Sequence, residues 1–311
     1  MQSETVYYRN GLSVVKMYVS ATEQEWRDDP EAFVRWVVDQ KTTRWAANSW
    51  RVFRASLRFF LTENGAPIEA IDLLSTLSQD IPPKQRVATS TNKKRFLMAD
   101  ALKIEAALAD PKSCRLTGGV YDKMLSMFIM ANIKIGLRPT EWDKASLVYV
   151  DGNPAVMVVN AKTSQGRGNG YARLLRVNQE TADLVLRAMS EKDHLASMGA
   201  EWNRVQHAMS VRIITVRDAV GIDGVTLYST RHQFSADAKS VGRSQREVAD
   251  MMGHASEATA GMHYGKKRVG TGNSIVFDAK GVTLEEFTKL IELSSIKYGD
   301  TKKEMVTIDH S

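Results

Sequence analysis

The feature that most constrains the fold is a break in the first third of the chain. The segment STLSQDIPPKQRVATSTNKKRF contains Pro82 and Pro83, which stop any helix, and then Ser, Thr and Asn residues without a hydrophobic period. A length of 311 residues is enough for about two domains. We therefore expect a first domain over residues 1–80, a basic linker over 81–95 and a second domain beginning at residue 96.

The first domain is predicted to be helical. Two segments, DPEAFVRWVVDQK and AANSWRVFRASLRFFLTENG, have the pattern of amphipathic helices, and the second ends near Gly65 with Pro67 just beyond. Its apolar residues recur at helical spacing and fall on one face, which comprises Trp50, Phe53, Leu57, Phe60 and Leu61. This domain can therefore bury a core of its own.

Basic residues gather in the same region, where Asp39 is the only acid between residues 35 and 60. A solvated helix face usually mixes both signs of charge, whereas a face of one sign suits a phosphate backbone. The linker is also basic, with no acid between residues 84 and 95. The candidate DNA-binding residues are Lys41, Arg44, Arg51, Arg54, Arg58, Lys84, Arg86, Lys93 and Lys94. The alternative is an ordinary solvated helix face and a flexible charged linker that needs no partner.

Composition excludes several classes of protein. The chain has a formal charge of +6, is 43% hydrophobic and has one cysteine, Cys114, so no internal disulfide can form. The polar start MQSETVYYRN does not resemble a signal peptide, and the longest apolar run, MLSMFIMANIKIGL, is too short to span a bilayer. These features predict a cytoplasmic protein with no membrane partner.

The second domain is predicted to be mainly helical with a small antiparallel sheet. KKRFLMADALKIEAALAD and VYDKMLSMFIMANIKIG indicate helices, the latter ending at Gly136. The runs SLVYV, AVMVVN and YARLLRV indicate strands, with the Gly-rich SQGRGNG as a hairpin tip between the last two. From Gln179 onward the pattern returns to helices. The fold class is therefore mainly α with a small antiparallel β-sheet.

Four segments of the second domain contain residues that could carry chemistry. They are GLRPTEW with Arg138, VVNAKTSQGRGNG with Lys162, TLYSTRHQF with Arg231, and MMGHASEATAGMHYGKKR with His254 and Tyr264. Each alone has an ordinary structural explanation, such as a surface arginine at a helix start or a solvent-exposed hairpin lysine. Their combination is more specific than any one of them.

Together the four segments resemble the tyrosine recombinase family, also called phage-type integrases. Lys162 follows Arg138 by 24 residues and His254 follows Arg231 by 23, which agrees with the order and spacing of that family. The resemblance covers residues 93–270. It implies a two-domain DNA clamp: a helical core-binding domain over residues 1–80, a catalytic domain over 96–280, and a C-terminal helix and tail over 281–311.

The resemblance also implies a mechanism without metal or external cofactor. A tyrosine hydroxyl attacks a DNA phosphodiester and forms a 3′-phosphotyrosyl bond, so one difficult exchange becomes two easier steps. Planar guanidinium groups can bind the phosphate oxygens bidentately, and a hairpin lysine can protonate the leaving 5′-oxygen. The roles carried over are Tyr264 as nucleophile, Arg138 and Arg231 on the phosphate, Lys162 as general acid, His254 hydrogen-bonding the phosphate or assisting proton transfer, and Glu141 orienting the site.

Two positions depart from the family pattern. Tyr228, three residues before Arg231, stands where the family most often has histidine, although its hydroxyl can still donate a hydrogen bond. Tyr264 follows His254 by 10 residues, one more than the commonest spacing, and His263 occupies the more usual tyrosine position. Tyr264 remains the expected nucleophile because the next tyrosine is Tyr298.

The resemblance implies double-stranded DNA with specific recombination sites as the partner. It also implies a homotetramer on DNA and admits accessory DNA-bending proteins. Near the C-terminus, Thr283 and Glu286 form a capping-box pattern ahead of an apolar stripe at Leu284, Phe287, Leu290, Ile291 and Ser294. That helix either folds back on its own domain or, as the resemblance implies, docks on a neighbouring protomer.

Three alternatives to a recombinase stay open from the sequence. One is a DNA-relaxing or hairpin-forming enzyme with the same chemistry. Another is a non-catalytic DNA-binding protein that retains the fold, for which the Tyr228 and spacing departures are the main support. The weakest is a metalloenzyme, because His232, His254 and His263 are not at usual ligand spacings.

Overall fold

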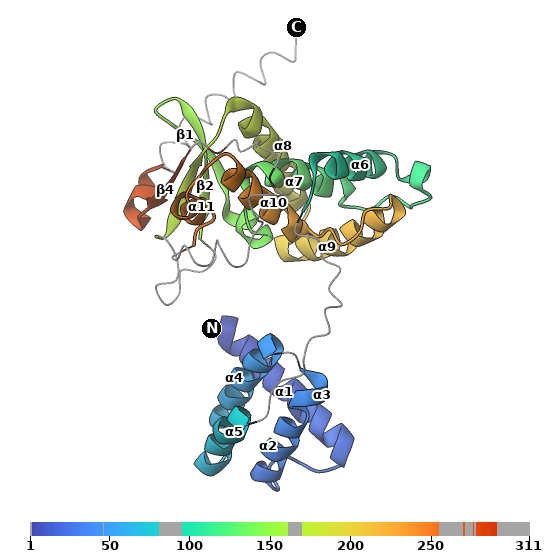
Figure 1. The fold of residues 1–311 in the computed structure, drawn as a ribbon, viewed down its shortest axis with the longest axis vertical. Helices are drawn as coiled ribbons and strands as arrows, with labels where there is room; N and C mark the ends of the chain where they lie inside the picture. Colours follow the sequence, from blue (N-terminus) through green and yellow to red (C-terminus); the bar gives the residue numbers. More distant parts are fainter. Residues whose placement is uncertain are drawn as a thin grey trace. The chain divides into compact units, whose positions relative to one another are not determined.

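The computed structural model describes residues 2–45, 47–80, 95–160, 170–254, 270, 276 and 278–290. The chain divides into two compact units, Met1–Ser90 and Thr91–Ser311, each with a hydrophobic core of its own (Figure 1). The division falls within the stretch 81–95 that the two prolines mark in the sequence.

The first unit is a set of helices around an aromatic-rich core. The long helix α1 packs along α4, and α2 packs on α5. Two of these helices, α1 and α5, are absent from the helices expected from the sequence. The elements are α1 (Gln2–Thr22), α2 (Pro30–Asp39), α3 (Lys41–Arg44), α4 (Ala47–Glu63) and α5 (Ile68–Asp80).

The apolar and the basic side chains of α4 lie on different faces of the helix, as the sequence predicts. Leu57, Phe60 and Leu61 are buried against α1 and the other helices, where Phe60 contacts the ring of Trp26. On the other face, Arg51, Arg54 and Arg58 are exposed, and Arg44 is exposed on α3. The basic face is therefore open to solvent over the described part of the first unit.

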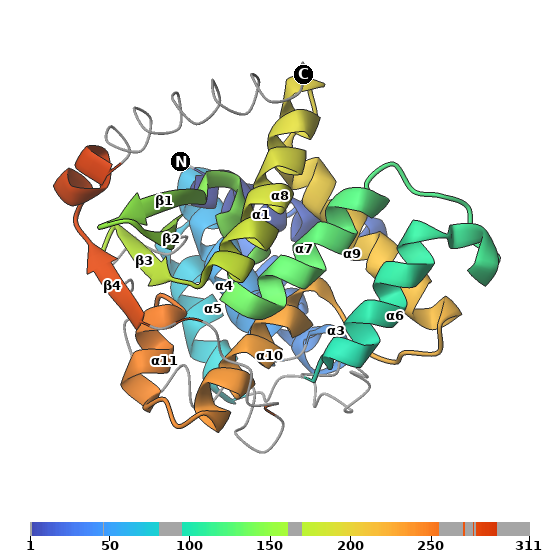
Figure 2. The same ribbon diagram turned by 90° about the horizontal axis from the view of Figure 1, so that it is seen from above.

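The second unit is built around the buried helix α7, which packs against α6, α8, α9 and α10 (Figure 2). Its N-terminal helix begins at Met98, later than the predicted start at the lysine pair Lys93–Lys94, and Pro139 starts a 3-10 helix. The helical elements are α6 (Met98–Ala109), η1 (Pro111–Cys114), α7 (Asp122–Ile135), η2 (Pro139–Lys144), α8 (Gln179–Ser197), α9 (Trp202–Ala219), α10 (Leu227–Ser240) and α11 (Gln245–Met251).

A four-stranded antiparallel sheet lies to one side of these helices, in the order β1-β2-β3-β4 (Figures 1 and 2). Val156 pairs with Leu175 and Ala172 with Val282. The strands are β1 (Ser146–Val150), β2 (Asn153–Val159), β3 (Ala172–Arg176) and β4 (Asp278–Val282). This architecture confirms the predicted fold class. The fourth strand was not predicted, and it crosses the expected domain boundary at residue 280.

The two faces of the sheet pack into different hydrophobic clusters. Val156, Val158 and Leu175 join the main core, whereas Met157 and Leu174 belong to a smaller cluster on the other face. Because side chains alternate along a strand, each strand contributes to both.

Residues 284–290 form a helix directly after β4. Its start has the predicted capping box: the backbone N–H of Thr283 donates to Glu286 Oε2 (2.9 Å), and the backbone N–H of Glu286 donates to Thr283 Oγ1 (3.2 Å). Phe287 and Leu290 pack on the smaller cluster of the sheet in the same chain. Ile291 and Ser294 of the expected apolar stripe lie outside the described residues.

None of the helices in the described ranges combines the length and the apolar content that a bilayer crossing requires.

Candidate active site

The structure brings four of the predicted site residues to one place. Arg138 is the N-cap of η2 and Glu141 lies in its first turn, Arg231 lies on α10, and His254 follows α11. Lys162 and Tyr264 fall outside the described residues, as do His263, Lys84, Arg86, Lys93 and Lys94.

Glu141 is the centre of this cluster. Pro139 at the first helical position starts η2, and the Glu141 backbone N–H donates to the Arg138 carbonyl (2.9 Å). The Arg138 backbone N–H donates to Glu141 Oε2 (2.8 Å), and Arg138 Nη1 donates to Glu141 Oε1 (2.5 Å). Glu141 therefore fixes both the backbone and the guanidinium of Arg138.

Arg231 joins the ends of two helices. It is fully buried on α10 and donates from Nη1 to the Gly136 carbonyl (2.5 Å) and from Nη2 to the Met252 carbonyl (2.6 Å). Its Nη1 also lies 3.7 Å from Glu141 Oε2. One guanidinium thus links the C-terminal ends of α7 and α11 to the Glu141 carboxylate. Carbonyls at helix C-termini are favourable partners for a cation.

Gly136 is the residue that lets α7 end at this point. Its φ of 65° is left-handed, and a Cβ there would lie 2.2 Å from the Phe234 ring. Only glycine meets both conditions without strain. The sequence predicted the helix end, and the structure shows that it presents a carbonyl to Arg231.

His254 lies against Arg231, with its Nε2 3.2 Å from Arg231 Nη2. A guanidinium can only donate, so Nε2 accepts and the neutral imidazole carries its proton on Nδ1. Burial disfavours the charged ring, and the positive charges of Arg231, Arg138 and Arg173 add to this effect, which together lower the pKa of His254 to about 3. The imidazole is therefore neutral near pH 7.

The ionisation of Glu141 is decided by its neighbours. Burial opposes the charged carboxylate, but the charges of Arg173, Arg231 and Arg138 and the hydrogen bond from Arg173 outweigh it. They hold the pKa of Glu141 well below its usual range. The cluster thus contains three guanidinium groups, one carboxylate and a neutral imidazole, and its net charge is positive.

Arg173 is a member of this cluster that the sequence analysis did not identify. It is 1% exposed on β3, and its Nη2 donates to Glu141 Oε2 (2.8 Å). The sequence YARLLRV could have indicated that Arg173 is buried. In a strand, Arg173 shares a face with Leu175, which packs in the core. An arginine at an inward-facing strand position needs a buried partner.

Asn132 is a second buried polar residue that sequence reasoning missed. Its Oδ1 accepts from the Leu137 N–H (2.9 Å) and from Trp142 Nε1 (2.9 Å). Its Nδ2 donates to the Leu137 carbonyl (3.0 Å) and to Thr230 Oγ1 (2.8 Å). One side chain on α7 thus holds the residue before Arg138, the η2 helix and α10 together.

Tyr228 is the position at which the family most often has histidine, and its ring lies beside another histidine of the same helix. It is on α10, 39% exposed, with its ring 5.8 Å from the ring of His232.

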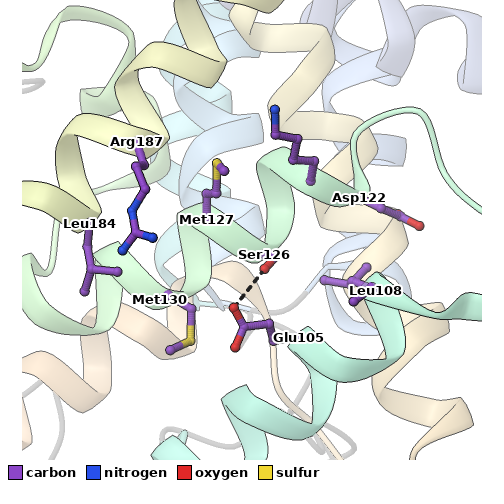
Figure 3. Close-up of a pocket in the computed structure, with 10 residues that line it drawn as sticks. Glu105, Leu108, Asp122, Ser126, Met127, Met130, Leu184 and Arg187 are labelled. Carbon is purple, nitrogen blue, oxygen red and sulfur yellow. Dashed lines mark hydrogen bonds between the residues drawn. The ribbon is translucent and has the colours of Figure 1, made fainter. Parts of the chain in front are cut away.

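A separate hollow of ≈ 330 Å³ lies between α6, α7 and α8 (Figure 3). Met127 and Met130 form part of its wall, and Ser126 Oγ lies 3.4 Å from Glu105 Oε1. Its lining, drawn from the described part of the chain, contains none of the residues of the Glu141 cluster.

The fold that carries this cluster is that of the tyrosine recombinases. The chain is similar to the crystal structure of a lambda integrase dimer bound to a COC′ core site, with a TM-score of 0.51 and 15% sequence identity over 84% of this chain and 71% of that chain. The fold implied by the sequence resemblance is thereby confirmed.

Further solved structures show similarity at lower TM-scores. A lambda integrase tetramer bound to a Holliday junction gives 0.49 at 15% identity, over 85% of this chain and 71% of that chain. XerA recombinase gives 0.37 at 16% identity, over 84% of this chain and 86% of that chain. No protein-family model and no curated protein matches the sequence.

Proposed function

We propose that this chain is a site-specific DNA recombinase that cuts and rejoins double-stranded DNA through a 3′-phosphotyrosyl intermediate. The observation that carries the proposal is one buried site in which Arg138 and Arg231 converge on Glu141 and His254 lies against Arg231. These residues come from three separate segments, which the fold of the tyrosine recombinases brings together.

The electrostatics of the cluster suit a phosphate. Three guanidinium groups against one carboxylate leave a positive charge in a site of low exposure, where charge interactions are stronger than in water. The phosphorane that forms during strand cleavage carries more negative charge on its non-bridging oxygens than the diester does. A preorganised positive site therefore stabilises the transition state more than the bound substrate.

The proposed reaction conserves the number of phosphoester bonds. The Tyr264 hydroxyl releases its proton to solvent as its oxygen bonds to phosphorus, the bond to the 5′-oxygen breaks, and Lys162 gives that oxygen a proton. A 5′-hydroxyl of a second strand then attacks the phosphotyrosine in the reverse sense. Neutral His254 acts as a hydrogen-bonding group, because the imidazolium is scarcely populated near pH 7.

The proposed partner is double-stranded DNA with specific recombination sites. The lambda integrase that this chain resembles was crystallised as a dimer on a core-site DNA. The exposed arginines of α4, Arg51, Arg54 and Arg58, would contact phosphates with Arg44 and the basic linker. Strand exchange between two duplexes needs four cleavages, so we further propose that a homotetramer forms on DNA.

Covalent trapping tests the proposal. The protein is incubated with fragmented genomic DNA from its source, denatured, and assayed for DNA that a protease releases from protein. The matched variants are Tyr264→Phe and Tyr298→Phe. Each removes one hydroxyl, from two tyrosines that follow one another in the sequence. We expect adducts with the wild type and Tyr298→Phe, and none with Tyr264→Phe although it still binds DNA.

Two other outcomes contradict parts of the proposal. An unchanged adduct with Tyr264→Phe would reject the nucleophile assignment. DNA binding without any adduct in the wild type would instead favour a non-catalytic DNA-binding protein. Relaxation of supercoiled DNA without exchange between two sites would favour a DNA-relaxing enzyme.

A further inference from the structure

The guanidinium of Arg173 is engaged by protein groups on every nitrogen. Nε donates to the Met251 carbonyl (3.0 Å), and Nη2 donates to Glu141 Oε2 (2.8 Å). Nη1 donates to Asn160 Oδ1 (2.5 Å) and lies 3.3 Å from Glu141 Oε1. Four of the five N–H groups that a guanidinium offers are thus used inside the protein.

We propose that Arg173 is a positioning residue of the proposed recombinase site, which fixes Glu141 and the C-terminal turn of α11 and thereby orients Arg138, Arg231 and His254. The inference rests on the proposed function for its catalytic readout. It assigns Arg173 no contact with the DNA phosphate, because protein acceptors take four of the five N–H groups of its guanidinium.

Arg173 and Arg231 hold consecutive carbonyls at the end of α11. Arg173 Nε binds the carbonyl of Met251, and Arg231 Nη2 binds that of Met252. These carbonyls are among those that a helix leaves without intrahelical partners. Since His254 follows two residues after Met252, the two arginines set the path of the backbone that presents its ring.

Gly253 shows how closely this turn packs on Arg173. It has a φ of 62°, and an added Cβ would lie 2.7 Å from Arg173 Nη1 and 2.6 Å from Asn160 Oδ1. The residue before His254 therefore rests directly on the Arg173–Asn160 pair. A shift of this pair would move the backbone next to His254.

Arg173 also connects the β2–β3 hairpin to the cluster. Asn160 follows the last residue of β2, and its backbone N–H donates to the Tyr171 carbonyl (3.0 Å) across the base of that hairpin. Arg173 binds both Asn160 and Glu141, so the hairpin base is tied to the residue that orients Arg138. In the sequence, Lys162 lies two residues after Asn160.

The geometry requires an arginine rather than a lysine. The planar fork reaches two oxygens of one carboxylate, an amide oxygen and a backbone carbonyl at the same time. An ammonium keeps the charge but has three donors on one atom, so it cannot span these acceptors. Charge and geometry can thus be separated by substitution.

The test uses Arg173→Lys, Arg173→Met and the control Arg176→Met. Arg176 lies on the same strand, but its side chain is half exposed and meets only Asp278, at 3.7 Å, among the ion pairs of the described residues. The readouts are the single-turnover rate of adduct formation, DNA affinity and thermal unfolding. Because a misplacement of about 1 Å can slow a reaction roughly 100-fold, we expect Arg173→Met to slow adduct formation about 100-fold.

In the same experiment we expect DNA affinity to change less than about threefold, because Arg173 is assigned no DNA contact. Arg173→Lys should recover part of the rate, and Arg176→Met should stay within about threefold of the wild type. A rate for Arg173→Met equal to that of Arg176→Met overturns the proposal. A rate loss fully explained by the unfolded fraction overturns it as well.

A double-mutant cycle with Glu141→Gln separates positioning from general destabilisation. If Arg173 acts through Glu141, the rate loss in the double variant is much smaller than the product of the single losses. Independent, multiplied losses would overturn the proposed route through Glu141. Where Arg173→Met does not fold, the cycle is run with Arg173→Lys.

A third readout does not depend on DNA chemistry, so it distinguishes failure of this inference from failure of the proposed function. Nitrogen NMR of the histidines reports the tautomer and pKa of His254 in each variant. We expect Arg173→Met to populate both tautomers and to raise the pKa of His254, because it removes a nearby positive charge and loosens the turn. Arg176→Met should leave both unchanged. An unaltered His254 in folded Arg173→Met overturns the inference even if the wild type cleaves DNA.

Discussion

The substitution Asn132→Ala tests whether one buried amide holds the site-bearing segments together. It removes the acceptor of two buried donors, the Leu137 N–H and Trp142 Nε1, and the donor to the Leu137 carbonyl and Thr230 Oγ1. Each buried donor left unsatisfied costs about 1–3 kcal/mol, so the two donors together cost about 2–6 kcal/mol. For a unit of this size, that loss lowers Tm by roughly 5–20 °C.

The assay is thermal unfolding at pH 7, with Asn203→Ala as the control. Asn203 is exposed on α9, so its removal should change Tm by less than about 2 °C. Adduct formation measured below both transitions should also fall in Asn132→Ala, because Leu137 immediately precedes Arg138. If Asn132→Ala unfolds at the same temperature as Asn203→Ala, then the four hydrogen bonds do not support the site as we have argued.

Three further predictions concern acid stability, the turn before His254 and DNA binding. His254 should remain neutral at pH 5 in the folded protein. Because the unfolded state then binds more protons than the folded state, the contribution of His254 to stability should fall as the pH decreases from 6.5 toward 3. Histidine NMR across this range checks the protonation state on which both expectations rest, and an imidazolium at pH 5 would contradict them. Gly253→Ala should lower the rate of adduct formation at least tenfold and Tm by several degrees. The φ of 62° and the close contact with neighbouring side chains both disfavour a Cβ at this position. An unchanged rate together with an unchanged Tm would refute this. The double variant Arg54→Ala/Arg58→Ala should weaken DNA binding and reduce the slope of log K against log salt by about 2, while Tm stays unchanged; an unaltered slope would remove these arginines from the DNA contacts.

Local patterns allowed much of the helical fold to be predicted. The helical spacing of apolar residues predicted α4, and an apolar segment followed by a glycine predicted α7 and its end. The structure contains both helices. The helix α1 was missed because Gly11 lies within it and weakens its propensity; its Val14, Val15 and Tyr18 are stabilised by burial in the core of the unit.

The fourth strand could not be predicted from local sequence. The residues DAKGV of β4 have weak strand propensity, and they pair with β3 from about a hundred positions away. Non-local pairing of this kind supplies the stability that the local sequence lacks. The expected boundary at residue 280 falls within β4, since Val282 is still part of the sheet.

The candidate site was predicted in part. Arg138 and Glu141 were both expected in the site, and the structure places Arg138 Nη1 2.5 Å from Glu141 Oε1. Spacing along the chain does not indicate which residue lies between Glu141 and α11. The positions of Arg173 and Asn160 in the cluster were therefore found only from the structure. The roles of Lys162 and Tyr264 stay predictions, as neither lies among the described residues.

The most direct measurement of the central claim is mass spectrometry of the trapped protein–DNA adduct. After nuclease and protease digestion, we predict a nucleotide attached through phosphate to the peptide that contains Tyr264, with the 3′-oxygen of the nucleotide on phosphorus. The same peptide should be unmodified in Arg231→Ala, because the phosphate then lacks its buried guanidinium. A nucleotide on any other residue, or the absence of an adduct when target DNA is bound and cleavage conditions are met, would contradict the proposed recombinase mechanism.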